Sequence, residues 1–311
     1  MLDLTPMSAR DPARVPCCVS IDVEEYFHVE AARGVVDSSR WDDWPSRVER
    51  NVDLLLTLFD ACGQRGTFFI LGHVAQRHES MVKRIAQAGH EIASHGSNHQ
   101  RLHQLNTETF RADVLACKEL LEDQTGQRVR GYRAPTFSVA RQTAWAIDVL
   151  VELGFEYDAS IFPVRYPWYG VPTAPISPFM VRNGSGPTLL EVPPLVYRLG
   201  SWNLAAAGGG YFRLLPLVLM QWALTQACRQ GRPAILYFHP WEFDPQMPRM
   251  PLSATGQIRT YTGLRRAQSR LERVMRRSGR WSPIGDVLGE LQALADTHPG
   301  FDLARCVITH N

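Results

Sequence analysis

Residues 66–95 read GTFFILGHVAQRHESMVKRIAQAGHEIASH and contain the unit from which the fold can be inferred. The strand-like run GTFFILG is followed by a helical stretch from Ser80 to Ala88, which Gly89 can end, and then by a second strand-like run, HEIASH. A strand, a helix and a strand in this order are typical of parallel strands with the helix packed outside the sheet.

The same unit recurs on both sides of this stretch. Before it, apolar residues recur at helical spacing from Val48 to Phe59, and Gly63 can stop that helix. After it, Thr107 can cap a helix that is followed by the strand-like VRGYRAP, and a helix over residues 142–153 is followed by FEYDAS. We therefore expect an α/β fold, either a barrel or a doubly wound sheet, whose strand ends form the active-site rim.

The C-terminal part of the chain is less regular. From Phe162 to Gly210 the sequence is rich in proline and glycine, which predicts an ordered loop over the rim. PAILYFHP then returns to a buried strand. We expect an N-terminal tail over residues 1–15 and a single domain over 16–311, because no linker composition separates two parts.

Residues 262–277 predict an amphipathic helix. One side carries Leu264, Ala267, Leu271 and Val274, and another carries Arg266, Arg270, Arg273 and Arg277. We interpret the arginine side as a solvated surface, with docking on an anionic membrane surface as the alternative.

Composition limits the classes of protein to consider. The chain has 311 residues, 45% of them apolar, with 33 Lys and Arg against 31 Asp and Glu, which excludes the strong basic field of a dedicated nucleic-acid binder. The longest apolar stretch, Leu214 to Leu224, holds 11 residues and contains Pro216, whereas a membrane-spanning helix needs about 20. With no signal-peptide pattern and six scattered cysteines without C-x-x-C, we expect a cytoplasmic protein with reduced thiols.

Two groups of residues suggest a metal site. His95 and His99 are spaced i, i+4, which on a helical turn would place both imidazoles on one side. The strand-like CCVSIDVEEYFH ends in Asp22, Glu24 and Glu25, and carboxylates at the end of a buried strand need partners. A site with a divalent metal and a general base would explain why carboxylates occur at the end of this strand.

Five motifs in order resemble the polysaccharide deacetylases, the NodB-homology or carbohydrate esterase family 4 group. They are SIDVEE (20–25), SHGSNH (94–99), RAPTF (133–137), YDASIF (157–162) and ILYFH (235–239). The forms DVEEYFH, GGGYFRLLP and FHPWEFDP are similar to the branch encoded with exosortase-type exopolysaccharide loci, which carries a C-terminal extension, here residues 241–311.

The resemblance implies a deformed (β/α) barrel with fewer strands than eight. It also implies metal-dependent hydrolysis of N-acetyl groups from amino-sugar units of an exopolysaccharide or its lipid-linked precursor. The implied cofactor is a divalent metal, with zinc expected, held by His95, His99 and one carboxylate. Side chains alternate along a strand, so Asp22 and Glu24 share a face if the strand continues past Val23. We therefore expect Glu24 as the ligand and Asp22 as the base.

Further roles follow from the resemblance. His239 would protonate the leaving amine, Asp158 would hold His239, and Arg133 would orient Asp22. The backbone N–H of Thr136 would meet the oxyanion. The expected substrate contacts are Pro135, Thr136, Phe137, Tyr237 and Trp241. Two residues depart from the family pattern, since Tyr237 stands where leucine is common and Phe162 where tryptophan is.

Two alternative functions remain open. The same metal site could hydrolyse C–N bonds of small amides, or the chain could bind polysaccharide without catalysis. Aromatic residues of the expected loop regions suit stacking on sugars and favour a glycan, although they could equally be loop core: Trp168, Tyr169, Trp202, Tyr211 and Trp241. The expected partners are an N-acetylated polysaccharide and membrane-bound polysaccharide assembly machinery, and no nucleic acid.

Overall fold

The centre of the protein is a ten-stranded sheet. A computed structural model describes residues 15–166, 169–277 and 281–309. The strands follow the order β10-β1-β2-β3-β4-β5-β7-β6-β11-β12, and the seven from β10 to β7 run parallel to one another. The predicted α/β architecture is confirmed.

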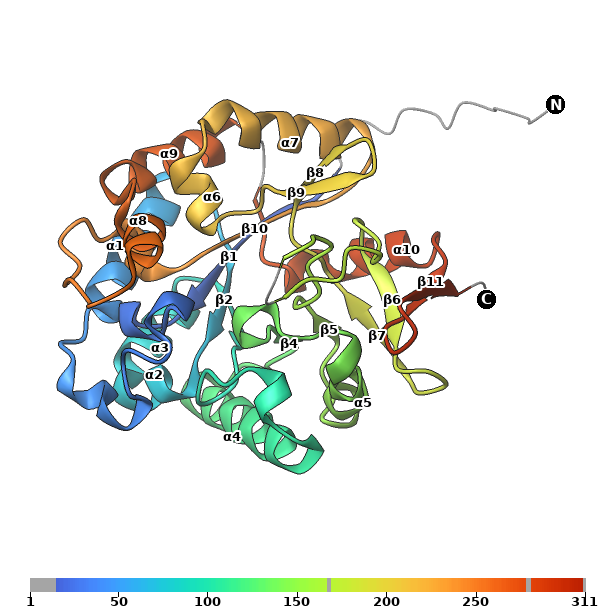
Figure 1. Cartoon of the computed structure of the whole chain (residues 1–311), viewed down its shortest axis with the longest axis horizontal. Coiled ribbons are helices and arrows are strands. Elements are labelled where there is room, and N and C mark those ends of the chain that lie inside the picture. The colour runs from blue at the N-terminus through green and yellow to red at the C-terminus, as the bar shows by residue number, and fades with distance from the viewer. Residues whose placement is uncertain (1–14, 167–168, 278–280, 310–311) are drawn as a thin grey trace.

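The strand bounds show why the carboxyl ends of the strands form one edge. They are β1 Cys17–Val23, β2 Thr67–Ile70, β3 Glu91–Ser94, β4 Gly131–Tyr132, β5 Tyr157–Asp158, β6 Phe179–Arg182, β7 Thr188–Glu191, β10 Ala234–Phe238, β11 Gly300–Asp302 and β12 Val307–Thr309. From β1 to β4, each strand is followed by helix on the outside of the sheet before the next strand begins (Figure 1). β11 and β12, which belong to the expected C-terminal extension, pair into the same sheet.

Each of the α-helices in the described residues buries part of its surface. Their bounds are α1 Val48–Ala61, α2 Gly72–Arg77, α3 Glu79–Gln87, α4 Thr107–Thr125, α5 Trp145–Glu152, α6 Gly209–Leu214, α7 Leu217–Arg229, α8 Ala254–Tyr261, α9 Leu264–Arg277 and α10 Leu288–Ala295. Gly63, Gly89 and Gly126 follow α1, α3 and α4 with positive φ, the conformation that ends helices and suits glycine. The N-cap of α4 is Asn106 and not Thr107, because the Asn106 side chain accepts from the N–H of Thr109.

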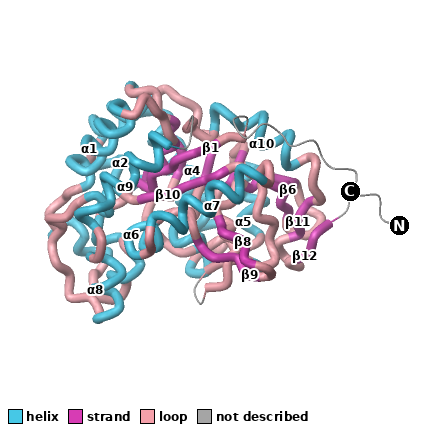
Figure 2. Tube along the Cα trace, turned by 90° about the horizontal axis from the view of Figure 1, so that it is seen from above, coloured by secondary structure: helices cyan, strands magenta, loops and turns pink. Residues whose placement is uncertain are grey.

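The expected loop from Phe162 to Gly210 is wrong in one respect, since it contains four strands. β6 and β7 extend the large sheet, and β8 (Val196–Leu199) and β9 (Trp202–Ala205) form a separate antiparallel hairpin beside α7 (Figure 2). Short strands between prolines and glycines left little periodicity to detect. None of the described helices is long and apolar enough to span a lipid bilayer, and all six cysteines are free thiols.

Candidate active site

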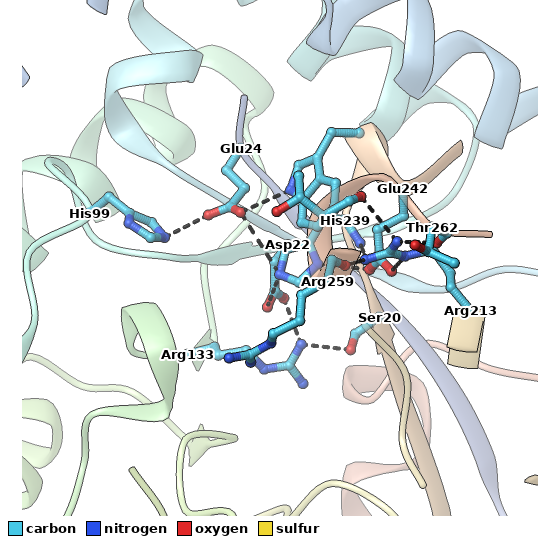
Figure 3. A network of polar contacts seen from close by, with 12 residues as sticks. Ser20, Asp22, Glu24, His99, Arg133, Arg213, His239, Glu242, Arg259 and Thr262 are labelled. Atoms are coloured by element: carbon cyan, nitrogen blue, oxygen red, sulfur yellow. Dashed lines mark hydrogen bonds and ion pairs between the residues drawn. The ribbon is translucent and has the colours of Figure 1, made fainter. Parts of the chain in front are cut away.

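The carboxyl ends of neighbouring parallel strands carry the polar residues of the site. Asp22 lies near the end of β1 with Glu24 just beyond it, His95 follows β3, Arg133 follows β4 and His239 follows β10. Side chains at the ends of adjacent parallel strands share one edge of the sheet, which is why residues far apart in the sequence meet there. Figure 3 shows Asp22, Glu24, Arg133 and His239 directed toward one another.

Glu24, His95 and His99 form a cluster suited to a metal ion. Each offers one ligand atom, and these atoms lie within 4.8 Å of one another. Oε2 of Glu24 is 2.6 Å from Nε2 of His99. The two histidines do not lie on a helical turn as the spacing suggested. They follow β3 in a loop, where His99 has a φ of 50°.

The donor set fits a divalent metal such as zinc. Nδ1 of His95 is 2.8 Å from the carbonyl oxygen of Arg133. A carbonyl only accepts, so Nδ1 carries the proton and the lone pair of Nε2 is left for a metal. Burial lowers the pKa of His95 to about 4, which keeps its imidazole neutral at neutral pH. Two imidazoles and one carboxylate match the ligands of catalytic zinc sites and leave coordination positions open.

Glu24 and Glu25 have different surroundings. β1 ends at Val23, so the expected alternation of side chains does not continue to Glu25. Glu24 nevertheless faces the histidines, and the interactions with His99 and His239 outweigh burial and hold its pKa below the ordinary value. Glu25 instead accepts from the N–H groups of Arg47 (3.0 Å) and Val48 (3.1 Å) at the start of α1. This carboxylate therefore stabilises a helix N-terminus.

Asp22 is positioned by a buried arginine. Nη1 of Arg133 donates to Oδ1 of Asp22 (2.6 Å) and to Oγ of Ser20 (2.7 Å), and Nε donates to the carbonyl oxygen of Ala159 (3.1 Å). The guanidinium lies 4.1 Å from the ring centroid of Phe69. The contact between Arg133 and Asp22 that the resemblance implied is present, and it leaves Oδ2 of Asp22 on the side of His239, 4.0 Å from Nε2.

His239 is held by a glutamate that the sequence analysis did not identify. Nδ1 of His239 is 2.8 Å from Oε1 of Glu242, which also accepts from the His239 backbone N–H (3.1 Å). The other oxygen of Glu242 accepts from Nε of Arg213 (2.7 Å). Nη1 and Nη2 of Arg213 donate to the carbonyl oxygens of Thr260, Thr262 and Arg259, so the whole chain of contacts is fixed by backbone (Figure 3).

The charges around His239 favour its protonated form. Burial alone would lower its pKa, but Glu24, Glu242 and Asp22 outweigh burial and raise it to about 9. Nε2 of His239 lies 3.8 Å from Oε1 of Glu24 and therefore points toward the three residues that could bind a metal. A protonated imidazole in this place can give a proton to a leaving nitrogen.

The expectation that Asp158 holds His239 is wrong. Asp158 ends β5, whereas β10 adjoins β1 at the other end of the parallel row, so Glu242 occupies the place on Nδ1. Oδ1 of Asp158 accepts from Ser160 (2.5 Å), and Asp158 lies opposite the buried Glu191 of the neighbouring strand β7. Burial raises the pKa of Asp158 to about 6 and that of Glu191 well above its ordinary value.

Most of the expected substrate contacts lie beside the site, but Trp241 is buried behind it. Thr136 is half-buried and adopts a φ of 58°, with Phe137 at 51°, so the RAPTF turn has a strained backbone beside the site. Phe137 packs edge to face on Tyr237, with ring centroids 4.8 Å apart. Trp241 is only 5% exposed, stacks on His239 and donates from Nε1 to Oε1 of Glu24 (3.1 Å). Its ring positions two site residues and is not presented to a sugar.

The residues missed from the sequence left unequal signals. Glu242 lies three residues after His239 in FHPWEFDP, and a carboxylate at that spacing beside a candidate acid could have been noted. Arg213 and Glu191 gave no local signal, because their partners are distant in the sequence. Trp168 lies outside the described residues.

Two family models match consecutive parts of the chain. Residues 38–157 match Polysaccharide deacetylase, and residues 159–289 match a domain of unknown function, DUF3473. The first match includes His95, His99 and Arg133, and the second includes Arg213, His239 and Glu242.

Curated relatives resemble part of the chain. The peptidoglycan deacetylase of Helicobacter pylori is 29% identical over 140 residues, which cover 43% of this chain and 47% of that protein. The peptidoglycan-N-acetylglucosamine deacetylase of Bacillus cereus is 32% identical over 85 residues, 27% of this chain and 31% of that protein. The matched segment thus spans about half or less of the length of these relatives.

Solved structures show the fold over nearly the whole chain. A Mycobacterium smegmatis structure assigned to the polysaccharide deacetylases has a TM-score of 0.59 at 22% identity, covering 92% of this chain and 93% of that one. The Puue allantoinase has a TM-score of 0.58 at 18% identity, with 91% of each chain covered. The expected deformed (β/α) barrel fold is confirmed by this likeness.

Proposed function

We propose that the chain is a metal-dependent deacetylase that hydrolyses N-acetyl groups of amino-sugar units in a polysaccharide, and the match of residues 38–157 to the Polysaccharide deacetylase family model supports this proposal. The products are acetate and the free amine. One observation carries the proposal: the Glu24, His95 and His99 cluster faces both a carboxylate, Asp22, and a protonated imidazole, His239. A site that only bound glycan would need neither a base nor an acid.

The metal would be held by Glu24, His95 and His99. When bound it supplies a water of lowered pKa and polarises the acetamide carbonyl. Asp22 would accept a proton from the attacking water on Oδ2, because Oδ1 is engaged by Arg133. The N–H of Thr136 donates to the oxygen of the tetrahedral intermediate. His239 then gives the proton on Nε2 to the departing nitrogen while Glu242 retains Nδ1.

We propose further that the substrate is an exopolysaccharide or its lipid-linked precursor. We also propose that the metal is zinc. GGGYFRLLP and FHPWEFDP support this substrate, since these motifs suggested the exopolysaccharide branch and lie within the DUF3473 match. GGGYFRLLP supplies Arg213 and FHPWEFDP supplies His239 and Glu242. We assign the protein to the cytoplasm, in peripheral contact with membrane-bound assembly machinery, as a single domain over 16–311.

The test is acetate release by the full chain from a panel of N-acetylated oligosaccharides, before and after exhaustive chelation and after adding zinc. We expect release that disappears with the metal and returns with zinc. A cyclic amide in the same panel tests the small-amide alternative. Undiminished release from the metal-free protein would overturn the mechanism, and glycan binding without release from the zinc-loaded protein would establish the non-catalytic alternative.

A further inference from the structure

Exposed apolar side chains gather on one part of the surface. Of the twelve large hydrophobic residues that are exposed in the described part of the chain, seven lie between residues 199 and 222. We call these seven the hairpin–helix face: Leu199, Trp202, Leu204, Leu214, Leu215, Val218 and Trp222. Trp202 is 67% exposed and Trp222 is 54% exposed. Apolar surface concentrated in this way is characteristic of a binding surface.

These residues surround a groove between the β8–β9 hairpin, α6 and α7. The groove has a volume of about 330 Å³, and every lining side chain is apolar or aromatic except that of Arg270. Leu199, Leu204, Leu215 and Trp222 belong to both the face and the lining, so the face is continuous.

The groove has fixed walls. Gln226 of α7 bonds both backbone groups of Arg198 in β8, with its oxygen 2.8 Å from the N–H and its nitrogen 2.9 Å from the carbonyl oxygen. Figure 1 and Figure 2 both show α7 beside the β8–β9 hairpin. The hairpin and the helix therefore form one supported surface.

The electrostatic character of this surface is positive. No Asp or Glu occurs between Glu191 and Glu242, a stretch that contains the whole face. On neighbouring α9, Arg270 lines the groove and donates to the carbonyl oxygen of Leu215 (2.5 Å). Burial lowers the pKa of Arg270, and the nearby charges of Arg266 and Arg273 lower it further. Both of these neighbours are exposed, and neither guanidinium has an ion pair or hydrogen bond among the described residues.

We propose that the hairpin–helix face binds the interfacial region of an anionic lipid bilayer, with a lipid acyl chain in the groove and lipid phosphates at Arg266, Arg270 and Arg273. Tryptophan rings favour the boundary between hydrocarbon and headgroups, and each nearby basic residue adds attraction to anionic lipid. A sugar would find few hydrogen-bonding groups in this groove.

A second copy of the chain fits the surface less well. In a symmetric dimer the same patch meets itself, so the arginines of one copy would approach those of the other. The face has no carboxylate with which to pair them. Lipid phosphates remove this repulsion, and a bilayer also covers the two exposed tryptophans.

Binding of the hairpin–helix face to a bilayer would bring the candidate active site near the membrane. α6 contributes Phe212 to the groove and, at the next position, Arg213 to the Glu242 that holds His239. Binding to a bilayer does not require catalysis, so this inference can be tested whether or not the proposed activity is found.

The experiment is co-sedimentation of the full chain with phosphatidylcholine vesicles that either lack or contain phosphatidylglycerol. We expect binding to the anionic vesicles that weakens at high salt, and at least about tenfold weaker binding to the neutral ones. Trp202→Ser with Trp222→Ser, and separately Arg266→Glu with Arg273→Glu, should each weaken binding by about tenfold or more. All four residues are exposed, and equal melting temperatures would verify folding.

Ile308→Ser is the matched control, because Ile308 is 54% exposed on β12, outside the face, and its variant should bind like the wild type. The proposal is overturned by equal binding to both kinds of vesicle, by absence of binding, or by equal loss in the control. It is also overturned if analytical ultracentrifugation shows a dimer that the two tryptophan substitutions dissociate, since the face would then be a contact between copies.

Discussion

The two sides of the candidate site come from different parts of the chain and are built in different ways. On one side, Glu24, His95 and His99 follow β1 and β3, close to strands that the sequence indicates. On the other, His239 depends on Glu242 and Arg213, and Arg213 depends on carbonyl groups near Thr260. The metal side is thus fixed by local strand ends, whereas the acid side is fixed by a buried network across distant segments.

This difference predicts that substitutions on the metal side remove the metal, whereas substitutions on the acid side lower turnover with the metal retained. The largest effect should come from the metal side. His95→Ala removes one of three ligands, so we expect the purified protein to lose its metal and acetate release to fall below detection. Metal analysis and acetate release measure both effects. His103→Ala, which changes a histidine outside the cluster, should retain the metal, and a fully active His95→Ala protein would contradict the assignment.

On the acid side, His239→Ala should retain the metal and lose turnover. General acid catalysis contributes about 10²–10⁴-fold, so kcat should fall by that factor. The measurements are kcat and zinc content on the same preparation. Metal loss in this variant would make His239 a ligand, and an unchanged kcat would remove it from the mechanism.

Glu242→Gln should have a smaller effect on turnover and a clear effect on folding. The substitution removes the charge that pairs with both His239 and Arg213 and leaves a buried arginine without a counter-charge. Breaking a buried pair costs about 3–5 kcal/mol of unfolding free energy, and losing a charged hydrogen bond to His239 should lower kcat by about 10–100-fold. Chemical denaturation and kinetics of the same protein test both parts.

Glu156→Gln changes a partly exposed ion pair near the surface and is the control, since about 1 kcal/mol or less is expected there. If Glu242→Gln were no less stable than Glu156→Gln and fully active, the buried network would have no role in holding His239.

Substitutions of the adjacent Glu24 and Glu25 test which of the two carboxylates binds the metal. Glu25→Ala removes the carboxylate at the start of α1, which should reduce the unfolding free energy by about 2 kcal/mol while leaving the metal content unchanged. Glu24→Ala should do the opposite and lose the metal. Metal loss only in Glu25→Ala would reverse the ligand assignment.

The N-terminal part of the fold could be predicted from the sequence better than the part after Asp158. The helices and strands predicted between Val48 and Asp158 have strong periodicity and glycine stops, and the structure has them close to where they were expected, together with α2 (Gly72–Arg77), which was not predicted. The strands between Phe179 and Ala205 are short and interrupted, so tertiary pairing decides them.

At the site, motif order indicated Asp22, His95, His99, Arg133 and His239, but it could not show which carboxylate reaches His239. That choice depends on the sheet order, which separates Asp158 from β10, and on a helix, η8 (Pro240–Phe243), that turns Glu242 back onto the ring. A sequence pattern does not contain this geometry.

The smallest expected effect concerns Asp158, which lies away from His239. Its pKa is raised from 3.8 to about 6, because burial favours the neutral form. The folded state therefore binds this proton more tightly than the unfolded state does, so stability is greatest below the unfolded pKa and is lost as the pH rises through the folded pKa. Asp158→Asn cannot ionise and should not share that loss. Relative to the wild type, its unfolding free energy should increase between pH 4 and pH 6, and kcat should change less than about tenfold with the metal retained. Urea denaturation across this pH range measures the difference. Parallel pH profiles for the two proteins, or a kcat loss as large as that of His239→Ala, would return Asp158 to the acid side of the site.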